Sequence, residues 1–246
     1  MPQTAPKEAH FTPASFKFLR QLAKNNNKDW FAAHKAEYEA QVKAPCLAFI
    51  ADLAAPLAKI SPQMVASPKA VGGSLFRIYR DTRFASDKTP YKTHAGMSFF
   101  HAATKQVARA AGANAMMGRL DAPVFYLHLE PGASFIGGGL WHPQPDTLKR
   151  IRANIVSNPA SWKKATRDPK FLKQFALGGD SLQRPPAGYP ADRELIEDLK
   201  RKDFVASSEL SEAEICDPGF LKEAVRRYVL MAPLVDWLCT SLDLEF

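Results

Sequence analysis

Residues 75–84 carry the side chains with the most distinctive chemistry in the sequence. Three arginines, Arg77, Arg80 and Arg83, fall within seven residues of an otherwise largely apolar and aromatic segment. A guanidinium group on a sheet strand is costly unless carboxylates, carbonyls or a bound anion satisfy its donors. Because Asp81 alone cannot satisfy three guanidinium groups, the segment predicts either a site for an anionic ligand or an internal network of salt bridges.

If residues 75–84 form a strand, alternate side chains point to opposite faces of the sheet. Arg77, Asp81 and Arg83 then share a polar face, whereas Arg80 lies on the apolar face with Ile78. We therefore expect Arg80 to be buried and paired with a carboxylate or main-chain carbonyls. On that basis, Arg80→Ala should cost about 3–5 kcal/mol of stability.

A second candidate segment is residues 124–130. Tyr126, His128 and Glu130 alternate onto one face of this predicted strand, and apolar side chains occupy the other face. If the polar face adjoins the arginines, the resulting cleft suits a phosphate or carboxylate ligand, because arginine binds these anions through paired hydrogen bonds and His128 can donate or move a proton. The candidate ligand-binding residues are Arg77, Arg80, Asp81, Arg83, Asp87, Lys88, Tyr91, Lys92, His94, Tyr126 and His128.

The histidine and glycine patterns do not predict a metal centre or a nucleotide-binding loop. His94, His101 and His128 lack the local spacing of a zinc motif, so a zinc or iron site would have to assemble from separate strands with Asp81 or Glu130. The sequence contains no G-x-S-x-G elbow and no G-x-x-x-x-G-K-[ST] loop. We therefore expect no metal and no cofactor, and whether the protein is an enzyme stays open.

Hydrophobic periodicity assigns these candidate residues to an α+β domain. Helical spacing covers the first sixty residues and returns after residue 145, whereas strands are expected at residues 75–84, 93–101, 124–130 and 134–141, with a further short strand at 204–206. Pro131 and Gly132 predict a tight turn, and short connections favour antiparallel pairing. The sequence therefore predicts one domain over residues 1–246, with a central antiparallel sheet flanked by N-terminal and C-terminal helices.

Local signals predict several boundaries within this domain. Asp29 and Asp146 are expected to cap helices, and Pro218 is expected to open the last helix. Three consecutive glycines at 137–139 can let the backbone approach a ligand, but glycines at a strand end are more typical of a bulge or tight bend. Residues 102–122 fit either a long loop or a poorly formed helix.

The composition is typical of a soluble globular chain. Hydrophobic residues make up 46% of the 246 positions, which is enough to fill a core. No apolar run approaches the ~18–20 residues of a membrane helix, and the N-terminus lacks the apolar segment of a secretion signal. The cysteines Cys46, Cys216 and Cys239 are too few and too scattered for a disulfide framework. We expect a cytoplasmic protein that does not span a membrane, and the oligomeric state is not indicated.

A basic stretch at residues 148–173 supports the alternative to an anion site. Its eight cations face only Asp168, within a chain of formal charge +8. A solvated helical surface is the simpler interpretation. Contact with nucleic acid should be weak, nonspecific and sensitive to salt, because no aromatic platform accompanies the lysines. The alternative is therefore a noncatalytic structural or interaction protein, in which the arginines form an internal network and this stretch meets nucleic acid or a protein partner.

The order of the charged residues also resembles a family signature. The matching positions are Arg77, Arg80, Asp81, Arg83, Phe84, Asp87, Lys88 and Tyr91. Residues 26–31, 125–131 and 137–141 are similar to the same family, the bacterial proteins called domain of unknown function 2461. The resemblance implies a soluble bacterial protein, and it carries no activity, substrate or catalytic residue.

Overall fold

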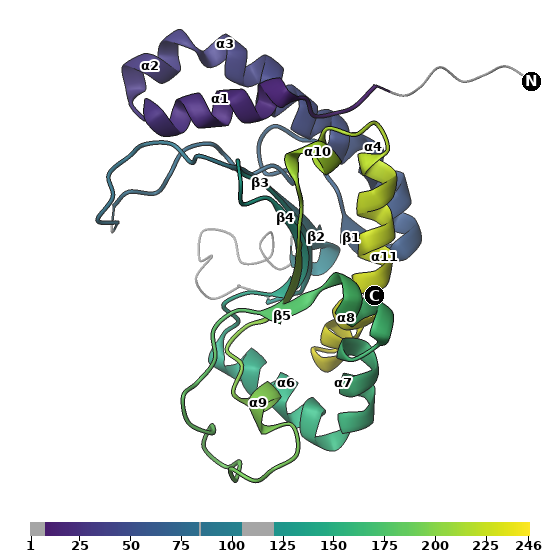
Figure 1. Ribbon diagram of the computed structural model, residues 1–246. Coiled ribbons are helices and arrows are strands. Elements are labelled where there is room, and N and C mark those ends of the chain that lie inside the picture. The colour runs from purple at the N-terminus through teal and green to yellow at the C-terminus, as the bar shows by residue number, and fades with distance from the viewer. Residues whose placement is uncertain (1–7, 84, 105–120) are drawn as a thin grey trace, which may run out of the picture.

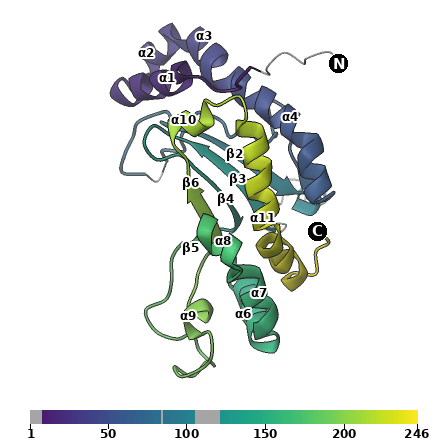
Figure 2. The ribbon, with the colours of Figure 1, turned by 45° about the vertical axis from the view of Figure 1, so that its right-hand side comes forward.

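The computed structural model describes residues 8–83, 85–104 and 121–246 and shows an α+β domain built on one antiparallel sheet (Figure 1). The strand order is β1-β2-β3-β4-β6-β5, and every neighbouring pair is antiparallel. Helices from the two ends of the chain cover one face of the sheet (Figure 2). The predicted fold class is therefore confirmed, whereas most of the 102–122 interval lies outside the described residues.

Four of the five expected strands are present: three lie close to their predicted bounds, and the one expected at residues 204–206 extends to residue 209. The strands are β1 (Met64–Val65), β2 (Ala95–His101), β3 (Val124–Leu129), β4 (Phe135–Leu140), β5 (Ala176–Gly178) and β6 (Phe204–Glu209). The turn at Pro131 and Gly132 joins β3 to β4, with Gly132 at a φ of 77°. A left-handed φ of this kind favours glycine, which accounts for the turn signal in the sequence.

The helices surround this sheet on the side of the core and at its ends. They are α1 (Pro13–Lys24), α2 (Lys28–Ala33), α3 (Lys35–Tyr38), the π-helical turn η1 (Glu39–Lys43), α4 (Ala44–Ile60), α6 (Pro145–Ser157), α7 (Pro159–Thr166), α8 (Pro169–Gln174), α9 (Ile196–Leu199), α10 (Glu212–Ile215) and α11 (Phe220–Ser241). Asn27, and not Asp29, caps α2, because its Oδ1 accepts from the Trp30 amide at 2.9 Å. Gln144 occupies the cap position of α6, and Asp146 lies in its first turn.

Helix α4 lies against α11, and together they bury the core face of the sheet. The side chains of Phe49, Leu53 and Leu57 on α4 are fully buried. The helical run Lys35–Ile60, which includes α4, is long and apolar enough to cross a membrane by length and composition alone. Its buried side chains belong to the core cluster of this domain, which is typical of a core helix in a globular protein.

The predicted strand at residues 75–84 is wrong. Within the described residues, this segment makes isolated bridges from Leu75 to Met97 and from Tyr79 to Tyr91, and it forms no strand. It follows the outer edge of β2 briefly and then leaves the sheet as a loop that projects away from it (Figure 1). The expected alternation also fails, since Phe76 is 46% exposed. Charged side chains gain hydration in a projecting loop that they would lose inside a sheet.

Residues 137–139 form the middle of β4, so their glycines serve close packing between elements. A Cβ atom on Gly138 would lie 2.7 Å from Met231 Sδ on α11. Gly139 has a φ of 122°, and its Cβ would lie 2.0 Å from the Phe204 carbonyl oxygen on β6. Close packing against α11 and β6, and not the expected bulge or tight bend at a strand end, therefore accounts for these glycines without a ligand.

Candidate functional site

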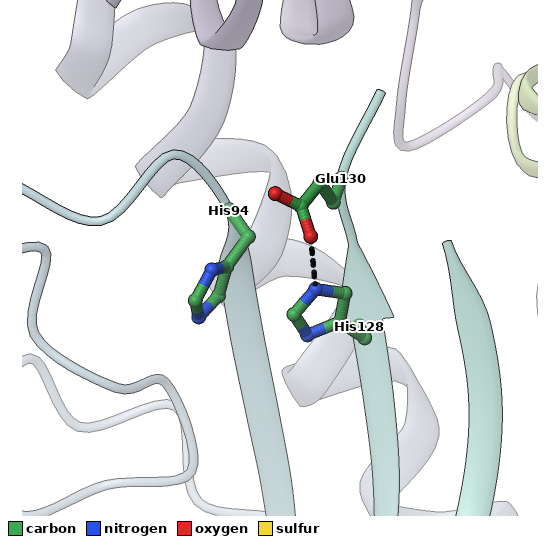
Figure 3. A group of neighbouring side chains, drawn as sticks. All are labelled: His94, His128 and Glu130. Carbon is green, nitrogen blue, oxygen red and sulfur yellow. Dashed lines mark hydrogen bonds and ion pairs between the residues drawn. The ribbon is translucent and has the colours of Figure 1, made fainter. Parts of the chain in front are cut away.

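Two strands bring two histidines and a carboxylate together on the polar face of the sheet, which is the face opposite α11 (Figure 3). In the β2–β3 register Ala95 pairs with Leu129, so His94, directly before β2, comes opposite Glu130. Glu130, directly after β3, is two residues from His128 and lies on the same face, as the sequence predicted. The side chains of His94, His128 and Glu130 therefore converge.

Hydrogen bonds connect this polar face into one chain. His128 Nε2 lies 3.0 Å from Glu130 Oε2 (Figure 3). The Tyr126 hydroxyl lies 3.2 Å from the other ring nitrogen of His128, Nδ1. The Thr93 hydroxyl donates to the other carboxylate oxygen of Glu130 at 3.2 Å. The Phe135 ring stacks on His128 with centroids 4.8 Å apart. Both the carboxylate and the imidazole are thus held in fixed orientations.

Burial keeps two side chains of this group, His94 and Tyr126, uncharged at pH 7. Burial, followed by the charge of His128, lowers the pKa of His94 to about 4, so His94 is neutral at pH 7. The His94 and His128 rings are 4.4 Å apart between centroids. Burial, followed by the charge of Glu130, raises the pKa of Tyr126 to about 12, so its hydroxyl keeps its proton. The face therefore offers the neutral imidazole of His94 close to the His128 ring and the Glu130 side chain.

Two cations adjoin this face at its open end. Lys92 Nζ lies 5.3 Å from the centre of the Phe76 ring, and that ring is 6.1 Å from the Tyr126 ring. Burial and the neighbouring positive charge of Arg77 lower the pKa of Lys92. Among the described residues, no carboxylate pairs with either Arg77 or Lys92. We call these two side chains the inner cations.

The tip of the same loop is instead neutralised by its own residues. Arg83 donates to both carboxylate oxygens of Asp81, at 3.0 and 2.7 Å. These bonds lower the pKa of Asp81 to about 2. Lys88 donates to the Thr82 carbonyl at 2.9 Å. An open hollow of about 430 Å³ at this tip is lined by Arg77, Tyr79, Arg80, Asp81, Thr82 and Arg83.

Arg80 is paired as expected, but it is not buried. Its guanidinium contacts the carboxylate of Asp87 and the hydroxyl of Thr89, and 31% of the side chain is exposed. The hydrogen bonds from the Thr89 amide and from Arg80 lower the pKa of Asp87 to about 2. The expectation of burial fails because the segment leaves the sheet, so the alternation of strand faces does not apply to Arg80.

Tyr91 fastens this loop to the N-terminal helices. Its amide donates to Asn26 Oδ1 at 3.1 Å, and its carbonyl accepts from Asn26 Nδ2 at 2.9 Å. The buried Tyr91 ring stacks on Phe31 with centroids 4.1 Å apart. These contacts give Tyr91 a packing role. They also explain why residues 26–31 and the arginine-rich segment both belong to the family resemblance seen in the sequence.

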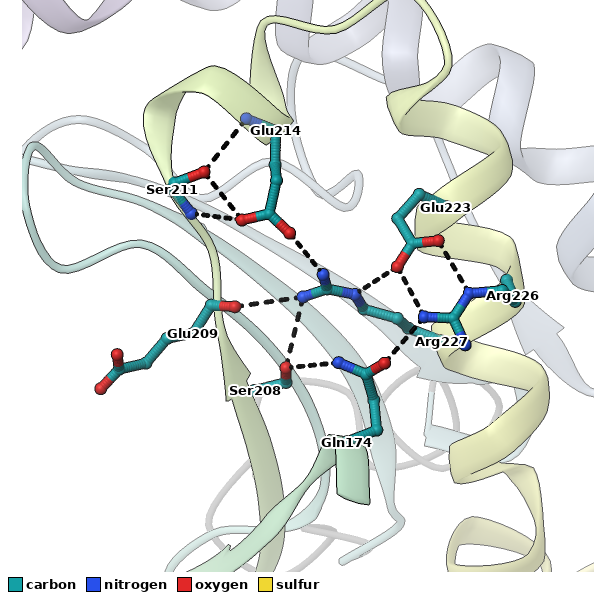
Figure 4. Close-up of polar contacts among 8 residues, drawn as sticks. All are labelled: Gln174, Ser208, Glu209, Ser211, Glu214, Glu223, Arg226 and Arg227. Carbon is teal, nitrogen blue, oxygen red and sulfur yellow. Dashed lines mark hydrogen bonds and ion pairs between the residues drawn. The ribbon is translucent and has the colours of Figure 1, made fainter. Parts of the chain in front are cut away.

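A buried salt-bridge network does exist, but it surrounds Arg227 on α11, which the sequence interpretation missed (Figure 4). The Arg227 guanidinium donates to carboxylates at 2.8 Å for Glu223 and 2.6 Å for Glu214. It also donates to the Ser208 hydroxyl and the Glu209 carbonyl at 3.2 and 3.1 Å. The spacing of Glu223 and Arg227 by four residues was a visible signal for an ion pair, but nothing local predicted its burial.

Half of the eight cations in the basic stretch at 148–173 already have partners within the protein. Arg150 contacts Asp243, Lys163 contacts Glu194, and Arg167 contacts Asp198. The Arg152 guanidinium donates to two main-chain carbonyls at 2.7 and 3.0 Å. Across the described ranges, four lysines of the stretch have no acidic partner: Lys149, Lys164, Lys170 and Lys173. Contact with a partner therefore stays a prediction for these four lysines.

Comparison with known proteins assigns most of the chain, including the candidate site, to a family. A model of the family described as conserved hypothetical protein (DUF2461) matches residues 14–237. No curated protein and no solved structure matches the chain. The matched region includes the polar face of the sheet, the inner cations and the charged loop tip. The resemblance seen in the sequence is thereby confirmed, and the chain belongs to the DUF2461 family.

Proposed function

We propose that the protein binds a small anionic ligand, bearing a phosphate or carboxylate group, between Arg77 and Lys92. The observation that carries this proposal is the pair of inner cations. Their positive charges lie close enough to affect each other, and no carboxylate among the described residues forms an ion pair with either of them, although the Asp81 carboxylate is near enough to Arg77 to interact with its charge. An anion placed there satisfies unpaired donors and removes a repulsion, so both effects favour binding.

The surroundings of the inner cations fit a ligand with an uncharged portion. Arg77 presents a planar fork that can donate two parallel hydrogen bonds to one phosphate or carboxylate group. The Phe76 ring beside Lys92, together with the Tyr126 hydroxyl beyond it, supplies an apolar surface and a polar group. The Glu130 carboxylate repels negative charge, so the anionic group belongs at Arg77 and the rest of the ligand toward His94 and His128.

This proposal assigns ligand binding to fewer residues than the sequence predicted. Arg80 and Arg83 are neutralised by Asp87 and Asp81, so neither is assigned to the ligand. Lys88 bonds to an uncharged carbonyl, so it contributes long-range positive charge. Tyr91 contributes by fixing the loop against α1 and α2. A cytoplasmic location in a bacterial cell, expected from the sequence, belongs to the same proposal, and all three cysteines are free thiols.

Thermal unfolding in the presence of inorganic phosphate or pyrophosphate tests the proposal. The protein is first depleted of metal with the uncharged chelator 1,10-phenanthroline. Its free energy of unfolding should then rise by about 2.7 kcal/mol when the phosphate concentration is a hundred times the dissociation constant. That gain corresponds to a Tm increase of about 5–10 °C for a domain of this size. Arg77→Gln and Lys92→Met should each abolish most of the increase.

Two control variants locate the effect. Lys163→Gln removes a cation in the basic stretch that pairs with Glu194, and it should leave the increase unchanged. Arg83→Gln removes a cation that Asp81 already neutralises, and it should reduce the increase only slightly. An increase lost with Arg83→Gln and kept with Arg77→Gln would move the site to the loop tip. No increase with any phosphate compound or carboxylate would refute anion binding.

A further inference from the structure

We propose that His94, His128 and Glu130 form a binding site for one divalent first-row transition metal ion, zinc or iron(II). The local spacing of the histidines did not predict such a site, and the pairing of β2 with β3 assembles it. This inference goes beyond anion binding by the inner cations, and neither proposal depends on the other.

The distances among the three side chains fit a common ion. Their potential ligand atoms, one from each residue, all lie within 4.8 Å of one another. His128 Nε2 and Glu130 Oε2 are 3.0 Å apart. Two ligands that each lie at about 2.0–2.2 Å from one ion are themselves about 3–3.4 Å apart, so this pair is already at the required separation. His94, whose side chain is partly buried, completes the set of three by a rotation of its ring toward the other two.

The strand geometry explains why these three residues meet at one point. Residues two apart on a strand share a face, which aligns His128 with Glu130. The residue opposite Glu130 across the β2–β3 pair is His94, and directly opposite side chains on one face lie about 4.5–5.5 Å apart at Cβ. The three potential ligands therefore approach one point from two neighbouring strands.

Outer contacts of the kind that support metal ligands are present as well. The Tyr126 hydroxyl lies at Nδ1 of His128, which leaves Nε2 directed toward Glu130. The Thr93 hydroxyl holds the second oxygen of the Glu130 carboxylate. Such partners fix the ring orientation and the tautomer of a metal-bound histidine, and they orient a metal-bound carboxylate. The Phe135 ring stacked on His128 restricts the imidazole further.

The chemistry of the ligands selects the class of metal. Two imidazole nitrogens and one carboxylate oxygen suit zinc, as in hydrolytic sites, and iron(II), as in sites with two histidines and one carboxylate on one face. Magnesium and calcium prefer all-oxygen sites, so they should bind much more weakly. With three protein ligands, the site has the open coordination of a reactive metal centre and not the closed set of a structural zinc.

Cobalt(II) titration of untagged, metal-depleted full-length protein tests this inference. Cobalt(II) bound to nitrogen and oxygen ligands gives visible absorption bands that report its coordination. We expect saturable binding of one equivalent, displaced by zinc(II) and not by magnesium(II). Glu130→Gln preserves the shape of the side chain, and it should weaken binding at least ~100-fold, as should His94→Ala.

Further variants separate this site from adventitious binding and from the anion site. His142→Ala removes a histidine that is 65% exposed elsewhere on the surface, and it should bind cobalt(II) like the native protein. Thr93→Ala should weaken binding by about 10–100-fold, because only an outer contact is lost. Arg77→Gln should keep metal binding while it loses the phosphate effect, so the two proposals can fail separately.

Three results of these titrations would refute the proposed metal site. Absence of saturable cobalt(II) and zinc(II) binding to the native protein would refute it. Binding unchanged in folded Glu130→Gln protein, with folding checked by the near-UV circular dichroism spectrum, would refute it as well. Loss of binding in His142→Ala with retention in His94→Ala would assign the ion to surface histidines and not to the polar face.

Discussion

Arg227→Met removes a buried guanidinium group and keeps the length of its aliphatic stem. Only 6% of the Arg227 side chain is exposed, and the group joins α11 to α10 and to β6 (Figure 4). The substitution leaves the partly buried Glu209 carbonyl without this donor, which costs about 1–3 kcal/mol. The Ser208 hydroxyl keeps the hydrogen bond from Gln174 at 3.0 Å.

The two carboxylates limit the size of the effect. Glu214 and Glu223 are 44% and 33% exposed at their side chains, so both can turn toward water when the guanidinium is absent. Their loss of a partner therefore costs less than the ~3–5 kcal/mol of a stranded buried charge. The cost of the Glu209 carbonyl and the cost of the two carboxylates together should lower the free energy of unfolding by about 3 kcal/mol. A loss of this size lowers Tm by about 6–12 °C.

Urea unfolding at neutral pH, followed by tryptophan fluorescence, measures this loss. Arg226→Met is the matched control, because Arg226 also donates to Glu223 but is 49% exposed. We expect less than ~1 kcal/mol for the control. Equal losses in the two variants, or a loss below ~1 kcal/mol in Arg227→Met, would refute the importance of the buried network.

The same network predicts a dependence on acid. Hydrogen bonds from Arg226 and Arg227 lower the pKa of Glu223 from 4.5 to about 2. Because the pKa is lower in the folded state, this stabilisation is fully present above about pH 4.5 and is lost as the pH falls toward 2. The stability advantage of the native protein over Glu223→Gln should therefore shrink across that range, and an advantage that is constant with pH would contradict it.

Four further predictions follow from individual contacts. Gly139→Ala should lose at least ~3 kcal/mol in urea unfolding, because its Cβ would meet the Phe204 carbonyl at 2.0 Å, whereas Gly132→Ala, in open space at a φ of 77°, should lose about 1 kcal/mol. Burial raises the pKa of Cys46 and of Cys239 to about 12, so an aromatic disulfide reagent should modify at most Cys216 in the native protein and all three thiols in denaturant. Arg80→Ala should cost about 1 kcal/mol and not 3–5 kcal/mol, since its ion pair is partly exposed. Nucleic acid should bind weakly, without sequence preference, and a filter-binding assay should show steep loss with salt; tight binding at high salt would contradict this.

The sheet could be predicted where the sequence alternates without strong charge. Residues 93–101, 124–130 and 134–141 alternate apolar and small or polar side chains, and the turn at Gly132 separates the last two, so local signals were sufficient. The segment 75–84 alternates equally well, yet its described residues, 75–83, form no strand. The described part of this segment pairs with the edge of β2 through Leu75 and with Tyr91 through Tyr79, and Tyr91 is in turn held by Asn26. Local periodicity carries no information about such distant partners.

The sequence predicted which residues belong to the candidate site, but it did not predict how they contact one another. Spacing by two put Tyr126, His128 and Glu130 on one face, and the structure confirms this. The approach of His94 depends on the register of β2 against β3, which no local signal specifies. The sequence showed an excess of cations near Asp81 but could not tell which arginine that carboxylate neutralises, since Arg77 and Arg83 were equally plausible partners.

A crystal structure of the protein with phosphate present at saturation tests the central claim most directly. The account predicts an anion within hydrogen-bond distance of both the Arg77 guanidinium and the Lys92 ammonium group, on the side of Tyr126. Direct pairing of Arg77 and Lys92 with carboxylates of the chain, or an anion bound at Arg80 and Arg83 with the inner cations unoccupied, would contradict it.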